Sequence, residues 1–220
     1  MQIIPSILTD NPKKLSDVIS KLNNVILPNG FPLERIQIDI NDGTFLDVKT
    51  TAPETFANLN CAQKLDFHLM VSDPIDWVDR CVRVKGDRVI GQIEHMSDQS
   101  AFIRRILELG IKAGLAVDIE TELLRIDPNV IRNLEILILM TYPAGKGGQD
   151  MNEGIYDKIE QLKEIKLKGG YNFNICLDGG ITLDNIKRVK LTGIDEVAIG
   201  NRIIDGDIEE NLEEFYKAMY

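Results

Sequence analysis

The sequence has few cysteines and no paired-cysteine motif. Its 220 residues include 3 cysteines, Cys61, Cys81 and Cys176, which lie far apart and form no CxxC pair. An even set of closely spaced cysteines is the usual mark of a disulfide-built domain, so this scarcity argues against such a framework. We expect reduced core thiols and a cytoplasmic protein.

Two further absences concern positive charge and apolar length. The chain carries 25 basic and 35 acidic residues, a net charge of −10, so it lacks the basic surface that nucleic acids and anionic membranes attract. No apolar run approaches the length of a membrane span, and the N-terminus has neither the basic nor the long apolar region of a signal peptide. We therefore expect no nucleic-acid partner and no membrane partner.

What is present is an alternation of strand-like and helix-like segments. Eight short apolar runs are typical of strands, and several are almost continuously hydrophobic, as parallel strands buried on both faces are. They cover residues 2–7, 35–40, 64–70, 88–94, 112–118, 134–140, 172–178 and 196–200. Apolar residues at helical spacing lie between or after them, at residues 12–22, 74–81, 98–109, 182–190 and 208–219.

This alternation predicts parallel strands joined by right-handed crossovers. Eight such units in this length favour an α/β fold of the closed (β/α)₈ TIM-barrel type. The rival is an open, doubly wound sheet, but its usual marker, GxGxxG after the first strand, is absent. Because no linker, low-complexity segment or break in composition interrupts the chain, we expect residues 1–220 to form a single domain.

Polar residues lie where the predicted strands end, which is the end that carries the chemistry in such barrels. In the second strand Gln37, Asp39 and Asn41 alternate with isoleucines and share one side. The mouth of the barrel lumen suits an amide, a carboxylate and an amide better than a position against helices. The other polar residues at strand ends are Ser6, His68, Gln92, Glu94, Asp118 and Asp178.

Glycines follow the last three predicted strands. They are Gly145, Gly147 and Gly148 after the sixth strand, Gly179 and Gly180 after the seventh, and Gly200, next to Asn201, at the end of the eighth. Glycine lets backbone N–H groups approach an anion closely, and the loops after strands seven and eight form the usual phosphate site of these barrels. The predicted phosphate-binding residues are Gly147, Gly148, Gly179, Gly180, Gly200 and Asn201.

Five motifs are spread along nearly the whole chain: PSIL at 5–8, IDINDG at 38–43, HLMV at 68–71, MT at 140–141 with GGQ at 147–149, and DGGI at 178–181. Together, and in this order, they resemble the ribulose-phosphate 3-epimerase family. The resemblance implies a TIM barrel of the ribulose-phosphate-binding type. It also implies an isomerase of pentose phosphate metabolism that inverts the carbon beside the ketone of a phosphorylated ketose. Members commonly assemble into dimers or larger rings, which implies a homo-oligomer.

The resemblance also assigns roles to particular residues. Family members use two aspartates, one on each face of the sugar, and a divalent metal held by two histidines and two aspartates. Carried over by motif, the catalytic pair is Asp39 and Asp178, and His68 is one metal histidine. Asp39, His68 and Asp178 are then the implied ligands of one divalent ion (Zn, Mn or Fe), and Ser6 matches the substrate-contacting serine.

The sequence departs from the family pattern around this implied metal. Gln37 stands in place of a metal histidine, Asn41 in place of a methionine, Gln92 in place of a histidine and Asn201 in place of a serine. An amide oxygen is a weaker ligand than imidazole, which makes Gln37 a doubtful ligand. Two alternatives stay open. Either three ligands hold the metal, or the amides of Gln37 and Asn41 donate hydrogen bonds to the oxyanion.

Three functions compete. The first is a 3-epimerase that interconverts D-ribulose 5-phosphate and D-xylulose 5-phosphate, or a related pentulose or hexulose phosphate, through an enediolate. Its substrate contacts would come from Ser6, Gln37, Asn41 and His68. A decarboxylase or aldose–ketose isomerase would need a lysine at a strand end, and none is present. A catalytically impaired phosphosugar-binding barrel, acting as a sensor or partner subunit, would keep the glycines but would not need both aspartates.

Overall fold

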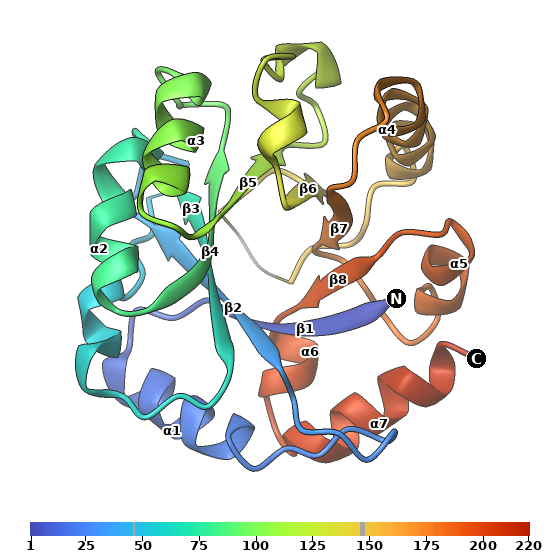
Figure 1. Ribbon diagram of the computed structural model, residues 1–220. Coiled ribbons are helices and arrows are strands. Elements are labelled where there is room, and N and C mark those ends of the chain that lie inside the picture. The colour runs from blue at the N-terminus through green and yellow to red at the C-terminus, as the bar shows by residue number, and fades with distance from the viewer. Residues whose placement is uncertain (46, 146–147) are drawn as a thin grey trace.

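Eight parallel strands close into a barrel in sequence order, and the last strand pairs with the first (Figure 1). The computed structural model describes residues 1–45, 47–145 and 148–220. The strands are β1 (Gln2–Ile7), β2 (Arg35–Asn41), β3 (Lys64–Met70), β4 (Gly86–Gln92), β5 (Lys112–Val117), β6 (Ile136–Met140), β7 (Asn174–Asp178) and β8 (Glu196–Ile199). The closed barrel confirms the predicted fold and excludes the open sheet. The strand that differs most from its prediction is β4, which both begins and ends earlier in the chain.

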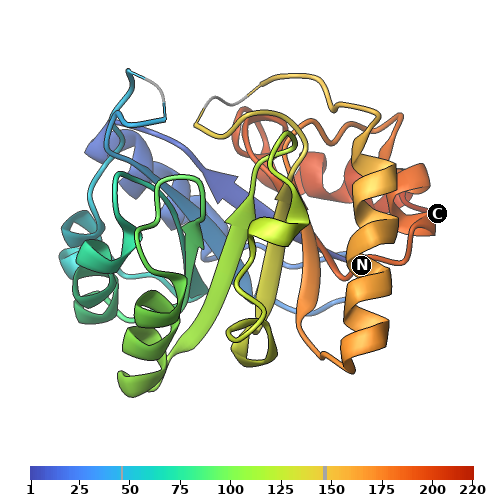
Figure 2. The same ribbon diagram turned by 90° about the horizontal axis from the view of Figure 1, so that it is seen from above.

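Helices surround the barrel on the outside (Figures 1 and 2). They are α1 (Pro12–Leu22), α2 (Val78–Arg83), α3 (Gln99–Glu108), α4 (Ile155–Gly169), α5 (Ile186–Leu191), α6 (Asn201–Ile204) and α7 (Ile208–Ala218), with the 3-10 turns η1 (Pro53–Asn58), η2 (Pro74–Trp77), η3 (Leu123–Arg125) and η4 (Ile131–Asn133). The connection from β5 to β6 contains the two turns η3 and η4 in place of an α-helix. No helix in the described ranges has the length and apolarity that crossing a membrane requires.

The first helix begins where local chemistry favours it. The side chain of Asn11 accepts hydrogen bonds from the backbone N–H groups of Lys13 and Lys14, at 2.9 and 3.2 Å, and Pro12 occupies the first helical position. A side-chain cap satisfies N–H groups that a helix start leaves unpaired, and a proline in the first turn has no N–H group to satisfy. The helix therefore presents its apolar stripe to the barrel from a defined starting point.

Helix α4 is not among the helices predicted above. Its buried stripe combines Ile155, Ile159 and Leu162 with Lys158, a buried lysine. The ammonium group of Lys158 donates hydrogen bonds to three backbone carbonyl oxygens in the segment that follows β5. Because a charged residue occupies a core position, the hydrophobic periodicity of this helix is weak in the sequence.

Layers of side chains fill the barrel lumen. The middle layer is apolar and includes Ile90, Ala116, Ile138, Cys176 and Ala198, all fully or almost fully buried. This layer separates a charged layer at the N-terminal ends of the strands from a polar layer at their C-terminal ends. The middle layer thus keeps two sets of buried charges apart, as the packed interior of such a barrel allows.

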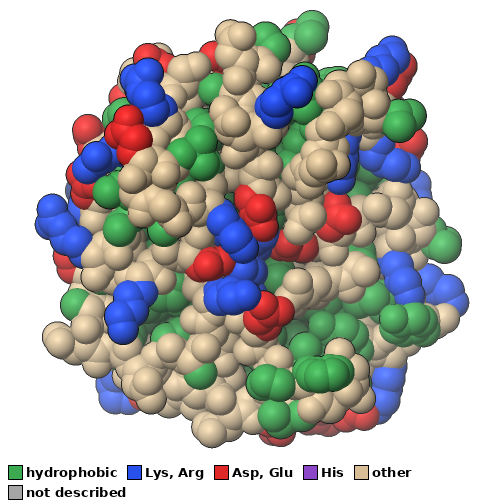
Figure 3. All heavy atoms as spheres, viewed as in Figure 1, with side chains coloured by type: hydrophobic (Ala, Val, Ile, Leu, Met, Phe, Trp, Pro, Cys, Tyr) green, Lys and Arg blue, Asp and Glu red, His purple; other side chains and the backbone are tan. Residues whose placement is uncertain are grey.

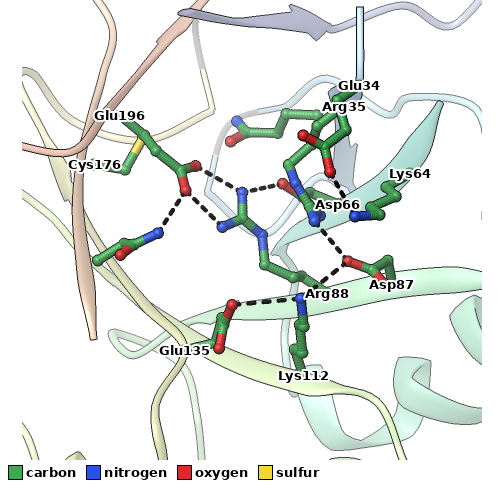
Figure 4. A network of polar contacts seen from close by, with 12 residues as sticks. Glu34, Arg35, Lys64, Asp66, Asp87, Arg88, Lys112, Glu135, Cys176 and Glu196 are labelled. Carbon is green, nitrogen blue, oxygen red and sulfur yellow. Dashed lines mark hydrogen bonds and ion pairs between the residues drawn. The ribbon is translucent and has the colours of Figure 1, made fainter. Parts of the chain in front are cut away.

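The charged layer is a network of ion pairs (Figure 4). Arg88 of β4 reaches across the lumen and donates two hydrogen bonds to the carboxylate of Glu196 on β8, at 2.9 and 2.7 Å. Arg88 also pairs with Asp66, and Arg35 pairs with Asp66 and, at 2.7 Å, with Asp87. Figure 3 shows acidic and basic side chains side by side at the centre of this end of the barrel. The network closes the lumen at the end opposite the polar layer.

Candidate active site

The polar layer at the C-terminal ends of the strands gathers residues from three strands. Register places Asp39 of β2 beside His68 of β3, and Asp178 comes from β7. Gln37, two residues before Asp39, lies on the same side of β2 and contacts both aspartates. The odd-numbered residues of β2 therefore point into the lumen, as their alternation predicts.

Gln37 joins the two carboxylates. Its amide nitrogen donates hydrogen bonds to Asp39 Oδ1 at 2.8 Å and to Asp178 Oδ2 at 2.6 Å. His68 Nδ1 lies 3.4 Å from each of the same two oxygens, and the His68 ring is fully buried. The other ring nitrogen, Nε2, is 2.9 Å from the amide oxygen of Gln92. With that oxygen as acceptor, Nε2 carries a proton and Nδ1 faces the carboxylates.

The electrostatics of this group follow from burial and from mutual charge. Burial raises the pKa of Asp39, and the nearby charge of Asp178 raises it further. Burial by itself would lower the pKa of His68, but the carboxylates of Asp178 and Asp39 outweigh that effect and raise it to about 10. A positive charge placed among these three side chains is therefore strongly favoured.

The residues present fit a divalent metal ion. One ligand atom from each of Asp39, His68 and Asp178 lies within 4.8 Å of the other two. His68 Nδ1 is buried, lies 3.4 Å from each carboxylate oxygen and forms no hydrogen bond of ordinary length, so a metal ion that displaces its proton would find this nitrogen without another partner. One imidazole and two carboxylates form a donor set that Zn²⁺, Mn²⁺ and Fe²⁺ accept. Gln37 turns its nitrogen to the carboxylates, so in this arrangement it is a hydrogen-bond donor and not a ligand.

A cavity of about 290 Å³ opens above the carboxylates. Its lining residues include Ser6, Asp39 and Asp178, together with five of the predicted phosphate residues: Gly148, Gly179, Gly180, Gly200 and Asn201. The sixth, Gly147, lies outside the described residues. Gly180 has φ +61°, and a Cβ there would come within 2.5 Å of the backbone of Met151. Glycine is needed at this position because any side chain would collide with that backbone.

Three of the predicted substrate-binding residues do not line this cavity. Gln37 and His68 contact the two carboxylates and are absent from the lining. Asn41 accepts a hydrogen bond from the backbone of Gly43 at 3.1 Å and donates a long one to the carbonyl of Gly145 at 3.4 Å. The Asn41 side chain thus links the loops after β2 and β6, which rise on the same side of the barrel in Figure 2.

Two polar side chains of the cavity lining are missing from the predicted site, those of Tyr142 and Arg202. Tyr142 is the second residue after β6, and Arg202 directly follows the Gly200-Asn201 pair after β8. The signal that could have found them is this position at strand ends, where a barrel carries its chemistry. Single polar residues in loops are common, so the position alone does not distinguish them from solvated surface residues.

Glu94 and Asp118 lie apart from the acidic pair, beneath the loop that follows β6. A Glu94 oxygen accepts a hydrogen bond from the backbone N–H of Asp118 at 2.9 Å, and Asp118 accepts one from the N–H of Ala144 at 2.7 Å. Burial and the charge of Glu94 raise the pKa of Asp118 to about 6. These carboxylates therefore connect the ends of β4 and β5 to the loop after β6.

A TIM barrel with an acidic pair and glycine loops at its C-terminal end is of the phosphosugar enzyme type, and sequence comparison gives the family. Residues 2–204 match the ribulose-phosphate 3 epimerase family, and the chain belongs to that family, whose members are isomerases that act on carbohydrates. The ribulose-phosphate 3-epimerase of Serratia marcescens is 28% identical over 91% of this chain and 94% of its own length. The enzyme of the same name from Escherichia coli (strain K12) is 27% identical over 92% and 88%.

Solved structures of other enzymes share the fold. The 3-hexulose-6-phosphate synthase of Salmonella typhimurium superposes with a TM-score of 0.65, at 15% identity, over 100% of this chain and 98% of that one. The phosphoribosyl anthranilate isomerase of Thermococcus kodakaraensis superposes with a TM-score of 0.67, at 13% identity, over 99% and 98%. At such low identity these likenesses show the barrel architecture alone.

Proposed function

We propose that this protein is a ketose-phosphate 3-epimerase that interconverts D-ribulose 5-phosphate and D-xylulose 5-phosphate, or a related pentulose or hexulose phosphate. The observation that carries the proposal is one cavity lined by both Asp39 and Asp178 and by the glycines after β7 and β8. An acid–base pair for proton transfer and a cradle for an anion are the two parts that this reaction needs. The names of the relatives from Serratia marcescens and Escherichia coli point to the same reaction.

The two aspartates exchange a proton with C3 of the substrate from opposite faces. One carboxylate removes the C3 proton, and the electron pair of the broken C–H bond passes into an enediolate. The other aspartate, protonated at the start, donates its proton to C3 from the opposite face and ends ionised. The reverse reaction exchanges the roles of Asp39 and Asp178. The amide of Gln37, bonded to both carboxylates, holds them in position for these transfers.

Asp39, His68 and Asp178 are the residues that hold a divalent ion (Zn, Mn or Fe) in this proposal. When bound, the ion supplies Lewis-acid stabilisation of the negative charge that develops on the substrate oxygens. The protein orients the imidazole through Gln92, whose oxygen lies 2.9 Å from His68 Nε2. Such a contact to the second ring nitrogen fixes the orientation of the ring, so that Nδ1 would face the metal once its proton is displaced.

The phosphate group of the substrate binds at the glycine loops. Gly148, Gly179, Gly180, Gly200 and Asn201 line the cavity beside the acidic pair, and Ser6 lines it too. Gly200 approaches Ser6 closely, since a Cβ on Gly200 would lie 3.2 Å from the Ser6 hydroxyl. We assign phosphate binding to these loops, with Gly147 among them, and a substrate contact to Ser6.

Exchange of the C3 proton with solvent deuterium tests the proposal. The protein is incubated with ribulose 5-phosphate in D₂O, first after metal removal and then with added Zn²⁺, Mn²⁺ or Fe²⁺, and products are followed by NMR. We expect deuterium at C3 together with xylulose 5-phosphate. Absence of exchange with both pentulose and hexulose phosphates would refute the epimerase function.

A phosphosugar-binding protein without catalysis is the second candidate. The observation that favours it is Gln37, whose amide nitrogen already satisfies both carboxylates at the position where the family motif carries a metal histidine. This candidate predicts that ribulose 5-phosphate raises the melting temperature without any turnover. Against it stands the retention of both aspartates in the cavity, which binding alone would not require.

We further infer that residues 1–220 form one domain and that the protein acts in the cytoplasm. The single-domain inference is supported by the pairing of β8 with β1, which closes the barrel between strands near the two ends of the chain. The cytoplasmic assignment is supported by three free cysteines, two of which are buried. Limited proteolysis tests the single-domain inference, and cell fractionation tests the cytoplasmic assignment.

A further inference from the structure

The cavity contains two polar side chains that the proposed reaction has not used, Arg202 and Tyr142. Arg202 is the one cation among the described residues that line the cavity, which otherwise contains the acidic side chains of Asp39 and Asp178. The whole protein carries a net charge of −10. A phosphorylated sugar is itself a dianion, so it enters an unfavourable field unless a positive charge lies close to its phosphate.

Arg202 is available for this purpose. It is an exposed residue at the start of α6, next to Asn201 in the lining, and its guanidinium forms no ion pair or hydrogen bond with the described part of the protein. A guanidinium offers several N–H donors in a planar fork that matches two oxygens of a phosphate. The backbone N–H groups of the glycine loops carry only partial charges, so Arg202 supplies the full charge that they lack.

Tyr142 lines the cavity beside Gly179, within range of the charges of Asp178 and Asp39. Its ring packs against Gly179, because a Cβ on Gly179 would come within 2.5 Å of the ring and 2.9 Å of the hydroxyl oxygen. Most of the Tyr142 side chain is buried, but its hydroxyl is not among the enclosed polar atoms, and within the described residues it forms no hydrogen bond. The hydroxyl therefore faces the cavity and is free to bond to a ligand oxygen there, while the ring is held by packing.

We propose that Arg202 and Tyr142 form a side-chain clamp on the phosphorylated end of the substrate. The Arg202 guanidinium pairs with the phosphate, and the Tyr142 hydroxyl bonds to a sugar oxygen between the phosphate and the reacting carbon. The clamp rests on the proposed function for its substrate class, a phosphorylated ketose. It makes the cavity selective for the phosphate dianion over a neutral sugar and makes binding weaker at high salt.

The experiment compares the variants Arg202→Gln, Arg202→Lys and Tyr142→Phe with the wild type. Binding of inorganic phosphate and of ribulose 5-phosphate is measured by calorimetry at two salt concentrations, and KM and kcat are measured in the C3 exchange assay. Arg104→Gln is the matched control, because Arg104 is an exposed arginine of α3 outside the cavity lining. Melting temperatures show whether each variant folds.

We expect Arg202→Gln to weaken binding of both ligands roughly 10- to 100-fold, the usual loss for a charged hydrogen-bonded pair. The loss should fall mainly on KM, shrink at high salt and be partly restored in Arg202→Lys. Tyr142→Phe should weaken ribulose 5-phosphate binding roughly 3- to 10-fold and leave phosphate binding within about twofold, because its bond goes to the sugar. Arg104→Gln should match the wild type.

The outcomes separate the clamp from the epimerase function. If Arg202→Gln folds and binds phosphate and ribulose 5-phosphate as tightly as the wild type, the clamp is refuted while the reaction stands. If the wild type binds ribulose 5-phosphate in an Arg202-dependent manner but catalyses no exchange, the clamp is supported and the epimerase function fails. If the wild type binds neither ligand, both proposals are overturned.

Discussion

The two ends of the barrel lumen both contain buried charges, but they pair them differently. At the N-terminal end, two arginines face two buried carboxylates, and Arg88 makes a two-pronged contact with Glu196. At the C-terminal end, Asp39 and Asp178 share one imidazole and one amide, and His68 Nδ1 has no hydrogen-bond partner. The charges at the N-terminal end are paired within the protein and need no ligand, whereas the carboxylates at the C-terminal end are completed by a cation or a substrate.

This contrast indicates that the charges at the N-terminal end contribute to stability and that those at the C-terminal end are used for chemistry. Removing one member of a balanced buried ion pair leaves a charge without a partner, which destabilises the folded state. A group of carboxylates that is short of positive charge is ready to bind ligands, and perturbed groups of this kind cluster at functional sites. The predicted variants below test whether the two ends can be separated in this way.

The largest expected effect is on catalysis at the C-terminal end. Asp178→Asn removes one member of the acid–base pair while keeping its size, so we expect the C3 exchange rate to fall about 10²- to 10⁴-fold. The free energy of unfolding, measured with urea, should change far less than it does when an ion-pair partner is removed at the N-terminal end. A variant that retains more than a tenth of the wild-type rate would contradict the role of Asp178.

Breaking the ion-pair network at the N-terminal end should affect the stability of the fold more than catalysis. Arg88→Met leaves Glu196 buried with Asn174 as its remaining partner, at 2.9 Å, and we expect a loss of about 3–5 kcal/mol in the free energy of unfolding. The measurement is equilibrium urea unfolding, with Arg104→Met on the surface as the control. A loss below about 1 kcal/mol would show that the network does not stabilise the barrel.

Metal binding should stabilise the C-terminal end alone. At a free metal concentration of about 100 Kd, binding adds about 2.7 kcal/mol to the stability of the wild type, which raises its melting temperature after chelator treatment. His68→Asn removes the imidazole ligand and should abolish most of that gain, whereas Arg88→Met should retain it. An equal gain in wild type and His68→Asn would place the metal elsewhere.

The smallest expected effect is a pH dependence beneath the loop that follows β6. The folded-state pKa of Asp118 is about 6, above its ordinary value of 3.8, so this group disfavours the folded state as pH rises through that window. Asp118→Asn retains an oxygen for the N–H of Ala144. The stability of the Asp118→Asn variant relative to the wild type should increase between about pH 4 and pH 6. The increase should be less than about 2 kcal/mol, because Asp118 is partly exposed.

Asp127→Asn provides a comparison of opposite sign for this measurement. The N–H group of Asn129 and the hydroxyl of Ser100 hold the pKa of Asp127 below its ordinary value. Asp127 therefore stabilises the fold once it is ionised, and the stability of Asp127→Asn relative to the wild type should fall as pH rises toward about 4. Difference curves of the same sign for both variants would contradict the burial argument for Asp118.

Much of the architecture is readable in the chain because it depends on local periodicity. The predicted strands and the parallel alternation lead to the barrel, and the confirmed elements include continuous apolar runs such as β6 and the alternating strand β2. The prediction failed for α4, where buried Lys158 interrupts the stripe and finds its partners in the segment after β5. A side chain whose partners are distant in sequence gives no local signal.

The site was partly predictable for the same reason. The alternation in β2 placed Gln37 and Asp39 in the lumen, and the glycines marked the phosphate loops. The contact of His68 with Gln92 and the entry of Tyr142 and Arg202 into the cavity depend on how separate strands meet. The alternation placed Asn41 on the same side as Gln37 and Asp39, but only the structure shows that its side chain bonds to Gly43 and Gly145.

The sequence by itself determined the order of strands, the face that each strand turns inward and the residue types at each strand end, because these follow from spacing along the chain. Tertiary structure alone decided which charges are balanced and which are not. Arg88 meets Glu196 across 108 residues, and Gln37 meets Asp178 across 141. Pairing over such separations is set by closure of the barrel, which brings distant strand ends within hydrogen-bond distance.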